Sequence, residues 1–320
     1  MACQAAVRPL VETRIRPVIL GHGMDSKRKH SPGVLPHQRV IEVGSSDASS
    51  YCARLFADFG ADVQKIEQPG GDRIRRTAPL TPKGQSAWFA FLNFNTILDP
   101  ADAGTIARLT ALIEDCDVLI DGRDVDSANC PPIDIGAIRA RHCGLTHVEA
   151  SWVGRGGPHA GFAATDSTIR ALAGLIKLVG PAEGPPSHAP DFQTSILAGL
   201  WGFIAAASSV IARMRGERGR RWSLSIFESS LALSEYLIFE ASAHAKVVRG
   251  IGINRFWPVF RTGIYETRKG WLGVTTFTPA RWRAFCDMLR LPNLETIRIC
   301  SSARIVCRIL NRSNNNSYRD

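Results

Sequence analysis

Charged residues beside glycine- and proline-rich loops are the positions in this sequence whose types and spacing could do chemistry. Asp191 follows one such loop, Gly180–Pro190, and precedes 21 residues without a formal charge. At a helix N-terminus this carboxylate could act as a nucleophile in acyl transfer, with backbone N–H groups stabilising the oxyanion. It could equally be a helix N-cap worth about 0.5–2 kcal/mol and nothing more. The residues alone leave both interpretations open.

Three further loops of similar composition each adjoin an expected strand or helix. They are Gln68–Arg76 (QPGGDRIRR), Gly154–Pro158 (GRGGP) and Gly216–Arg221 (GERGRR). His188 lies in the loop before Asp191, where an ordinary loop histidine is the favoured interpretation.

Several common site motifs are absent. The turn Gly44–Asp47 lacks the GxGxxG fingerprint of dinucleotide sites, and no P-loop, GxSxG elbow, HExxH or EF-hand loop occurs. The eight cysteines include no CxxC pair. We therefore expect no metal, no permanently bound cofactor and reduced thiols in a cytoplasmic protein.

Strands and helices alternate along most of the chain, and this predicts a doubly wound, Rossmann-like α/β domain with a parallel sheet. Helices are expected from a Ser49 N-cap to Phe59, and over Ala103–Cys116, Thr165–Val179, Asp191–Arg215 and Glu228–Val248. Strands are expected at Val40–Val43 and Val63–Ile66, and over Asp117–Asp121, Thr146–Val153 and Trp222–Phe227.

The character of the sequence changes after Gly250. Gly263–Tyr265 and Trp271–Thr275 read as a β-hairpin, and Pro279–Leu289 reads as a helix. We expect a basic N-terminal extension (1–38), a large α/β domain (39–228), a connecting helix (229–250), an incomplete small α+β domain (251–295) and a divergent, disordered tail (296–320).

The charge distribution argues against nucleic-acid binding. The chain has 320 residues and a formal charge of +10, but residues 40–295 carry 27 basic and 26 acidic side chains. A nucleic-acid binder would more often place its positive charge on a face of the fold. The uncharged stretch Phe192–Ala212 is long enough to span a bilayer, but its serines and glycines favour a buried helix, so no membrane partner is expected.

In this order and spacing, the motifs resemble those of the family III CoA-transferases, a superfamily that includes alpha-methylacyl-CoA racemase. The most specific match is Ala53–Arg76 (ARLFADFGADVQKIEQPGGDRIRR). The GRGGP loop, Gly184-Pro185-Pro186 with the following Asp191, and the Tyr265–Gly270 turn also match. The resemblance covers about residues 39–295 and implies the family's fold and a homodimer.

The resemblance implies that Asp191 is the nucleophile of an acyl-CoA:carboxylate CoA-transferase. Its carboxylate would attack the thioester of an acyl-CoA to give a mixed anhydride, and CoA would then form an aspartyl thioester that a small carboxylic acid resolves. The CoA-binding residues expected on this basis are Ser46, Asp47, Gln68, Gly70, Gly71, Arg75 and Arg123, with Arg76 a further candidate for phosphate.

Two alternatives stay open. The related 2-methylacyl-CoA racemases use a histidine at the position of Thr165, and threonine does not exchange protons near neutral pH. A second racemase acid would be sought at Glu228 or Glu240. Because the resemblance fades after Glu295, the other alternative is a truncated, catalytically impaired CoA-binding remnant.

Overall fold

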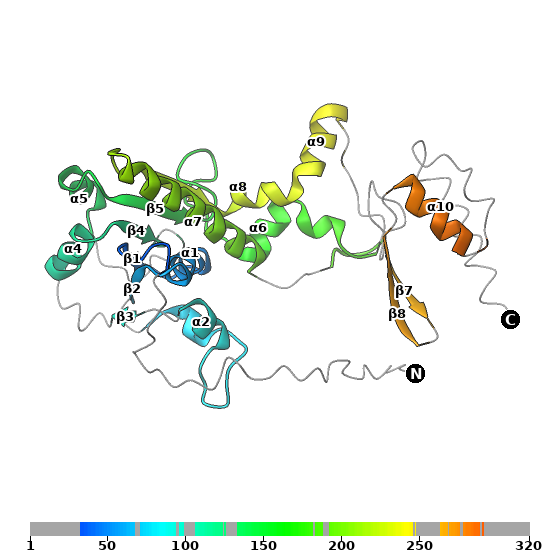
Figure 1. Cartoon of the computed structure of the whole chain (residues 1–320), viewed down its shortest axis with the longest axis horizontal. Coiled ribbons are helices and arrows are strands. Elements are labelled where there is room, and N and C mark those ends of the chain that lie inside the picture. The colour runs from blue at the N-terminus through cyan, green and yellow to red at the C-terminus, as the bar shows by residue number, and fades with distance from the viewer. Residues whose placement is uncertain are drawn as a thin grey trace.

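Six parallel strands form the central sheet of the protein (Figure 1). The computed structural model describes residues 33–67, 71–93, 96–98, 106–123, 125, 133–181, 183–187, 192–245, 247, 263–267, 269–275, 278–288 and 290. The strand order is β3-β2-β1-β4-β5-β6. The strands are β1 (Arg39–Val43), β2 (Asp62–Ile66), β3 (Thr96–Leu98), β4 (Val118–Asp121), β5 (Thr146–Ser151) and β6 (Arg221–Ser225). This is a doubly wound order, so the predicted fold class is confirmed.

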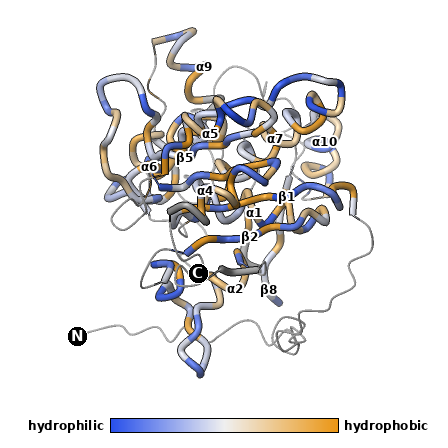
Figure 2. The backbone as a smooth tube through the Cα atoms, turned by 90° about the vertical axis from the view of Figure 1, so that its left-hand side faces the viewer, coloured by the Kyte–Doolittle hydropathy of each residue, from blue (hydrophilic) through white to orange (hydrophobic). Residues whose placement is uncertain are grey.

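Helices cover both faces of the sheet, and each face has its own buried apolar cluster. On one face, α1 (Asp47–Asp58) and α7 (Gln193–Met214) pack over Val40 of β1. On the other, α4 (Ile106–Glu114) and α5 (Ile135–Arg141) pack over Ile41. Successive strand residues face opposite sides, which explains why buried strands read as continuous apolar runs. Figure 2 shows hydrophobic segments gathered in the sheet and the helices around it.

The uncharged segment forms α7, which packs against α1, β5 and β6. Gly199 allows the close approach to α1, because a Cβ there would lie 2.6 Å from the carbonyl oxygen of Ala48. By length and composition α7 is also the one helix among the described residues that could cross a membrane. In its most apolar stretch of 18 residues, 39% of the residues are buried. The predicted burial therefore holds for one side. The other side exposes apolar residues, namely Leu200, Trp201, Ile204, Ile211 and Met214.

The remaining elements connect or extend this sheet. They are α2 (Ala87–Leu92), α6 (Asp166–Leu172), α8 (Ile226–Leu231), α9 (Glu235–His244), α10 (Pro279–Met288), and 3₁₀ helices at Arg73–Arg76, Leu175–Leu178 and Ala232–Ser234. The antiparallel pair β7 (Gly263–Thr267) and β8 (Gly270–Val274) confirms the predicted hairpin. In Figure 1, this hairpin and α10 lie at the opposite end of the molecule from α4 and α5.

Several predicted boundaries are wrong. The N-cap of α1 is Ser46 and not Ser49, because the Ser46 hydroxyl accepts the Ser49 backbone N–H. The helix predicted over Thr165–Val179 is interrupted at Gly174, whose φ of 75° is left-handed, and continues as a 3₁₀ helix.

Two further boundaries differ in the second half of the chain. The strand predicted to end at Phe227 ends at Ser225, which caps α8. The helix predicted over Glu228–Val248 is divided into α8, a 3₁₀ turn and α9. The predicted domain boundaries and the predicted tail stay predictions.

Candidate functional site

Three loops meet where β1 and β4 end, at the point where the strand order reverses. Open α/β sheets bind ligands outside the carboxyl ends of their strands at such a point. The β1–α1 turn and the 71–76 loop are joined by a hydrogen bond from Ser45 to Asp72 and an ion pair of 3.0 Å between Arg73 and Asp47. The turn after β4 lies against them, since a Cβ on Gly122 would be 2.9 Å from that of Ser46.

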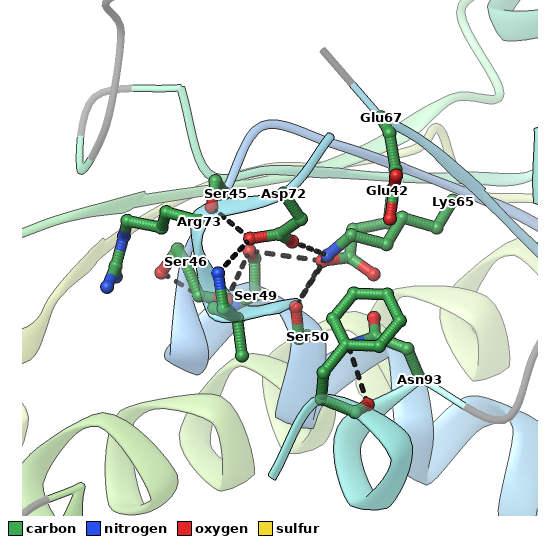
Figure 3. A network of polar contacts seen from close by, with 12 residues as sticks. Glu42, Ser45, Ser46, Ser49, Ser50, Lys65, Glu67, Asp72, Arg73 and Asn93 are labelled. Carbon is green, nitrogen blue, oxygen red and sulfur yellow. Dashed lines mark hydrogen bonds and ion pairs between the residues drawn. The ribbon is translucent and has the colours of Figure 1, made fainter. Parts of the chain in front are cut away.

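A buried ionic network supports these loops from below (Figure 3). The Lys65 Nζ atom lies 2.8 Å from Glu42 Oε1, 2.8 Å from Asp72 Oδ2 and 2.8 Å from Ser50 Oγ. All four side chains are buried. A buried ammonium with two carboxylates and a hydroxyl fixes the strand ends to the 71–76 loop.

Burial and neighbouring charges shift the pKa values of these groups in different directions. Burial alone would raise the pKa of Asp72, but Lys65 and the hydrogen bond from Ser45 more than offset it, so the pKa lies below its ordinary value. Burial raises the pKa of Glu42, and Lys65 offsets this only in part. Burial would lower the pKa of Lys65, but the two carboxylates raise it above its ordinary value.

Ser46 and Asp47, expected to bind CoA, are engaged in the fold itself. The buried Ser46 hydroxyl caps α1. Asp47 is 5% exposed, and its Oδ1 accepts a hydrogen bond of 2.7 Å from Trp88 Nε1 while its Oδ2 pairs with Arg73. Their side chains therefore shape the loops, and CoA contact by either residue stays a prediction.

Arg75 and Arg123 lie in the same loops, and each is paired with an acid. Arg75 contacts Glu67 at 2.9 Å and lies over the Phe89 ring, 4.0 Å from its centroid. Arg123 forms a two-point contact with Asp121 at 2.9 and 2.8 Å. The Arg75 side chain is 44% exposed and that of Arg123 is 19% exposed. Arg75 is thus the more accessible guanidinium for an incoming phosphate.

The other predicted site residues divide between described and undescribed parts of the chain. Gly71 is described, with a left-handed φ of 82°. Arg76 is the last residue of the 3₁₀ helix and is exposed. Residues outside the described part are Gln68, Gly70, His188 and Asp191.

The residues that follow position 191 belong to the described part of the chain. Phe192 precedes α7 with φ 71° and ψ 0°, and its ring stacks on Trp88 with 4.6 Å between centroids. No side chain at this N-cap position caps the helix. Asp166 of α6 does so instead, because its Oδ1 accepts from the Ser195 backbone at 2.9 Å and from Thr194 Oγ1 at 2.5 Å. Sequence reasoning missed both contacts, because they join residues far apart in the chain.

Thr165, at the position of the racemase histidine, has a structural role. Its hydroxyl caps α6 by accepting from the Thr168 backbone at 3.3 Å. Of the two acids sought for a racemase, Glu228 lies in the first turn of α8, and Glu240 lies in α9, 3.5 Å from His244. A threonine hydroxyl does not act as an acid or base near neutral pH, and this one caps a helix, so the arrangement does not favour racemisation.

On the face of the sheet that α4 and α5 cover, three side chains of metal-ligand type lie together. Asp121, His147 and Glu149 are buried, and one ligand atom of each lies within 4.8 Å of the others. Their carboxylates already face guanidinium groups: Arg123 on Asp121, and Arg155 and Arg221 on Glu149 at 2.5 and 2.7 Å. Burial would raise the pKa of Asp121, but the nearby His147 and the hydrogen bonds from Arg123 hold it below its ordinary value. A cation would have to displace three arginines, so the donor set fits an ion-pair network and not a metal centre.

Two similar proteins are both named as CoA-transferases. One is the succinyl-CoA:mesaconate CoA-transferase of Haloarcula hispanica, 25% identical over 86% of this chain and 72% of its own length. Another is the succinyl-CoA–D-citramalate CoA-transferase of Chloroflexus aurantiacus, 26% identical over 85% of this chain and 68% of its own length. A crystal structure of a CAIB/BAIF family protein from Brucella suis has the same fold, with a TM-score of 0.71 at 20% identity over 90% of this chain and 77% of that one.

The sequence model of CoA-transferase family III matches residues 35–311, which is most of the chain. That match includes the large sheet, the loops at its carboxyl edge, the segment around residue 191 and the hairpin. The motif-based prediction is confirmed: the protein belongs to CoA-transferase family III and is an enzyme of this type.

Proposed function

We propose that this enzyme is an acyl-CoA:carboxylate CoA-transferase in which Asp191 accepts the acyl group. The observation that carries the proposal is the start of α7 at Gln193, two residues after this aspartate. The backbone N–H groups and the dipole of a helix N-terminus favour an anionic group there. An ionised carboxylate is already a competent nucleophile, so no separate base is required.

The reaction steps are those that the family resemblance implies. In each step, the acyl bond that breaks is replaced by a new acyl bond. An Asp191 oxygen attacks the thioester carbonyl, the C–S bond breaks, and CoA leaves as a thiolate with a mixed anhydride behind. The thiolate attacks the aspartyl carbonyl, releasing the donor acid and giving an aspartyl thioester. The acceptor carboxylate attacks that thioester and releases the thiolate. The thiolate then attacks the acceptor's acyl carbonyl, forming the new acyl-CoA and freeing Asp191. Anhydride and thioester are close in energy, so no ATP is needed.

The substrates we propose are succinyl-CoA and a short dicarboxylic acid. The names of the similar proteins support this, because mesaconate and D-citramalate are both five-carbon dicarboxylates. A substrate with two carboxylates keeps one charge free while the other reacts. Arg75, with its partly exposed guanidinium, supports binding of anionic groups at the carboxyl edge of the sheet.

The test is direct detection of the acylated residue. The protein is incubated with succinyl-CoA, quenched with hydroxylamine or borohydride, and digested for peptide mass spectrometry. We expect a modification on Asp191 that appears with the donor and disappears when mesaconate or D-citramalate is added. Asp191→Asn should carry no modification and should lose transferase activity by at least about 10³-fold. Unmodified Asp191 in an enzyme that turns over would refute the proposal.

We also propose that the enzyme is a cytoplasmic homodimer. The family resemblance supports the dimer, and so does the apolar side of α7, where Trp201 is 45% and Ile211 is 52% exposed. Such residues along one helix face are typical of surfaces that pack against protein. Free thiols at Cys52, Cys116, Cys143 and Cys286 support a reducing compartment.

A further inference from the structure

Phe192 adopts a backbone conformation that its own sequence does not favour. Its φ of 71° and ψ of 0° are left-handed, a region that bulky side chains rarely enter. Strained conformations persist where the surroundings impose them, and they often occur at functional sites. The contacts that impose this one can be traced on both sides of the residue.

On one side, Trp88 holds the Phe192 ring. The two rings stack with 4.6 Å between centroids and an angle of 22° between planes. The indole is itself fixed, because its Nε1 donates to Asp47 Oδ1 at 2.7 Å. Asp47 cannot swing away easily, since it is 5% exposed and pairs with Arg73 at 3.0 Å. A tryptophan that is only stacked could slide, whereas this one is also pinned by a charged acceptor.

On the other side, Asp166 holds the first turn of α7. It is 7% exposed, and a single oxygen, Oδ1, accepts from both the Ser195 backbone and the Thr194 hydroxyl. An N-cap normally comes from the residue that precedes the helix. Here that residue is Phe192, whose side chain cannot accept a hydrogen bond, and the cap comes from another helix. Phe192 is therefore held on one side by the stack with Trp88 and on the other by the first turn of α7, which is bonded to Asp166 of α6.

We propose that Trp88 and Asp166 are positioning residues for acyl transfer, because they fix the turn at Phe192 and the start of α7, which directly follow Asp191 in the chain. The inference rests on the proposed function, in which Asp191 is the nucleophile. One peptide bond joins residue 191 to Phe192, so the backbone direction at 192 limits where the preceding side chain can reach. A misplacement of about 1 Å in a reacting group can lower the rate about 100-fold, so a rigid mount has a direct kinetic value.

The experiment separates positioning from simple stability. Asp166→Ala removes the cap, Asp166→Asn keeps an acceptor oxygen, and Trp88→Leu removes both the stack and the indole N–H. Asp134→Ala is the matched control, because Asp134 caps α5 on the opposite face of the sheet. Each variant is assayed with succinyl-CoA at least 10 °C below its own Tm, for kcat, KM and the single-turnover rate of Asp191 acylation.

We expect Asp166→Ala and Trp88→Leu to lower kcat and the acylation rate by about 10–100-fold. The KM for succinyl-CoA should change by less than about 3-fold, since neither residue is assigned to CoA. Asp166→Asn should recover most of the lost rate, because the carbonyl oxygen can still accept from Thr194 and Ser195. Asp134→Ala should lower Tm without lowering kcat.

Two outcomes would overturn the inference alone: folded Asp166→Ala and Trp88→Leu enzymes that acylate Asp191 at the wild-type rate, or rate losses no larger than that of Asp134→Ala. If Trp88→Leu does not fold, Trp88→Phe keeps a stacking ring but loses the N–H, and its rate decides the same point. Failure of the proposed function is distinguished by the wild-type enzyme, which would then turn over without an adduct on Asp191, and the inference would fall with it.

Discussion

Lys65 joins parts of the chain that no local pattern connects. Its ammonium is buried with Glu42 from β1 and Asp72 from the loop that follows β2. The sequence pattern around it predicts the strand, but nothing in that pattern indicates that this lysine is buried. Its burial follows from the tertiary contacts of two acids, and these cannot be seen in the spacing.

Replacing Lys65 should therefore be far more damaging than replacing a surface lysine. Lys65→Met would leave two buried carboxylates without their counter-charge, and we expect a loss of about 3–5 kcal/mol in the free energy of unfolding. Lys83→Met, at an exposed lysine, is the control and should stay within about 0.5 kcal/mol. Urea unfolding measures both. Equal midpoints for the two variants would contradict the buried network.

The depressed pKa of Asp72 predicts a definite pH dependence. A carboxyl whose folded pKa lies below its unfolded value stabilises the fold above the unfolded value, near pH 4, and loses that contribution as the pH falls through the folded pKa. The stability difference between wild type and Asp72→Asn should be full at pH 7 and should shrink below about pH 4. Asp58→Asn, in an exposed pair with Arg54, should give a small difference at every pH. Urea titrations between pH 3 and 7 measure this, and an Asp72→Asn difference that grows in acid would contradict the assignment.

At the scale of elements, the contact between α1 and α7 depends on Gly199 having no side chain. A Cβ on Gly199 would lie 2.6 Å from the Ala48 carbonyl oxygen and 3.0 Å from Tyr51 Cβ. Neither neighbour is the end of a flexible side chain, so the helices would have to separate.

Gly199→Ala should destabilise the protein by about 1–3 kcal/mol, although alanine is the better helix former. Gly136→Ala, within α5, is the matched control. Its Cβ would meet only the Asp134 side-chain oxygen, at 3.2 Å, so we expect a neutral or slightly stabilising effect. Thermal unfolding distinguishes the two. A Gly199→Ala protein as stable as wild type would show that the helix contact is looser than described.

Elements were predictable where apolar periodicity was strong. β1, α1, β2, β4, β5 and α7 follow their patterns to within a few residues. The short helix α2 was missed because AWFAFL is apolar on nearly all sides and has no period to read. The interruption at Gly174 was missed because its neighbours keep a helical pattern on both sides, and only the left-handed backbone of that glycine ends α6.

At the scale of the whole molecule, the candidate site was predictable only in part. The loops at the carboxyl edge were identified from composition and family motifs. The contacts of Trp88 and Asp166 were not, because each connects segments about 30 to 100 residues apart, and only folding brings them together. Asp47 was expected to face a ligand, and the structure assigns its carboxylate to Trp88 and Arg73.

The oligomeric state should respond to the exposed side of α7. If the proposed homodimer uses this surface, Trp201→Lys should shift the protein from dimer to monomer in sedimentation equilibrium, because a charge would have to be buried in the contact. Ser208→Lys, at an exposed position of the same helix, tests how far along the helix the contact extends. A wild-type monomer at micromolar concentration would exclude the dimer.

The hydrogen bonds from Thr194 and Ser195 to Asp166 cross-link positions 28 and 29 residues apart. The intervening chain is thereby anchored at its base, and its loop-closure entropy changes slowly with length. Residues can be added, removed or exchanged in the part of that span between the 3₁₀ helix at Leu175–Leu178 and Asp191 while the two anchor points stay together. Relatives that handle different acids could thus diverge in this segment and still keep the same helix start beneath it.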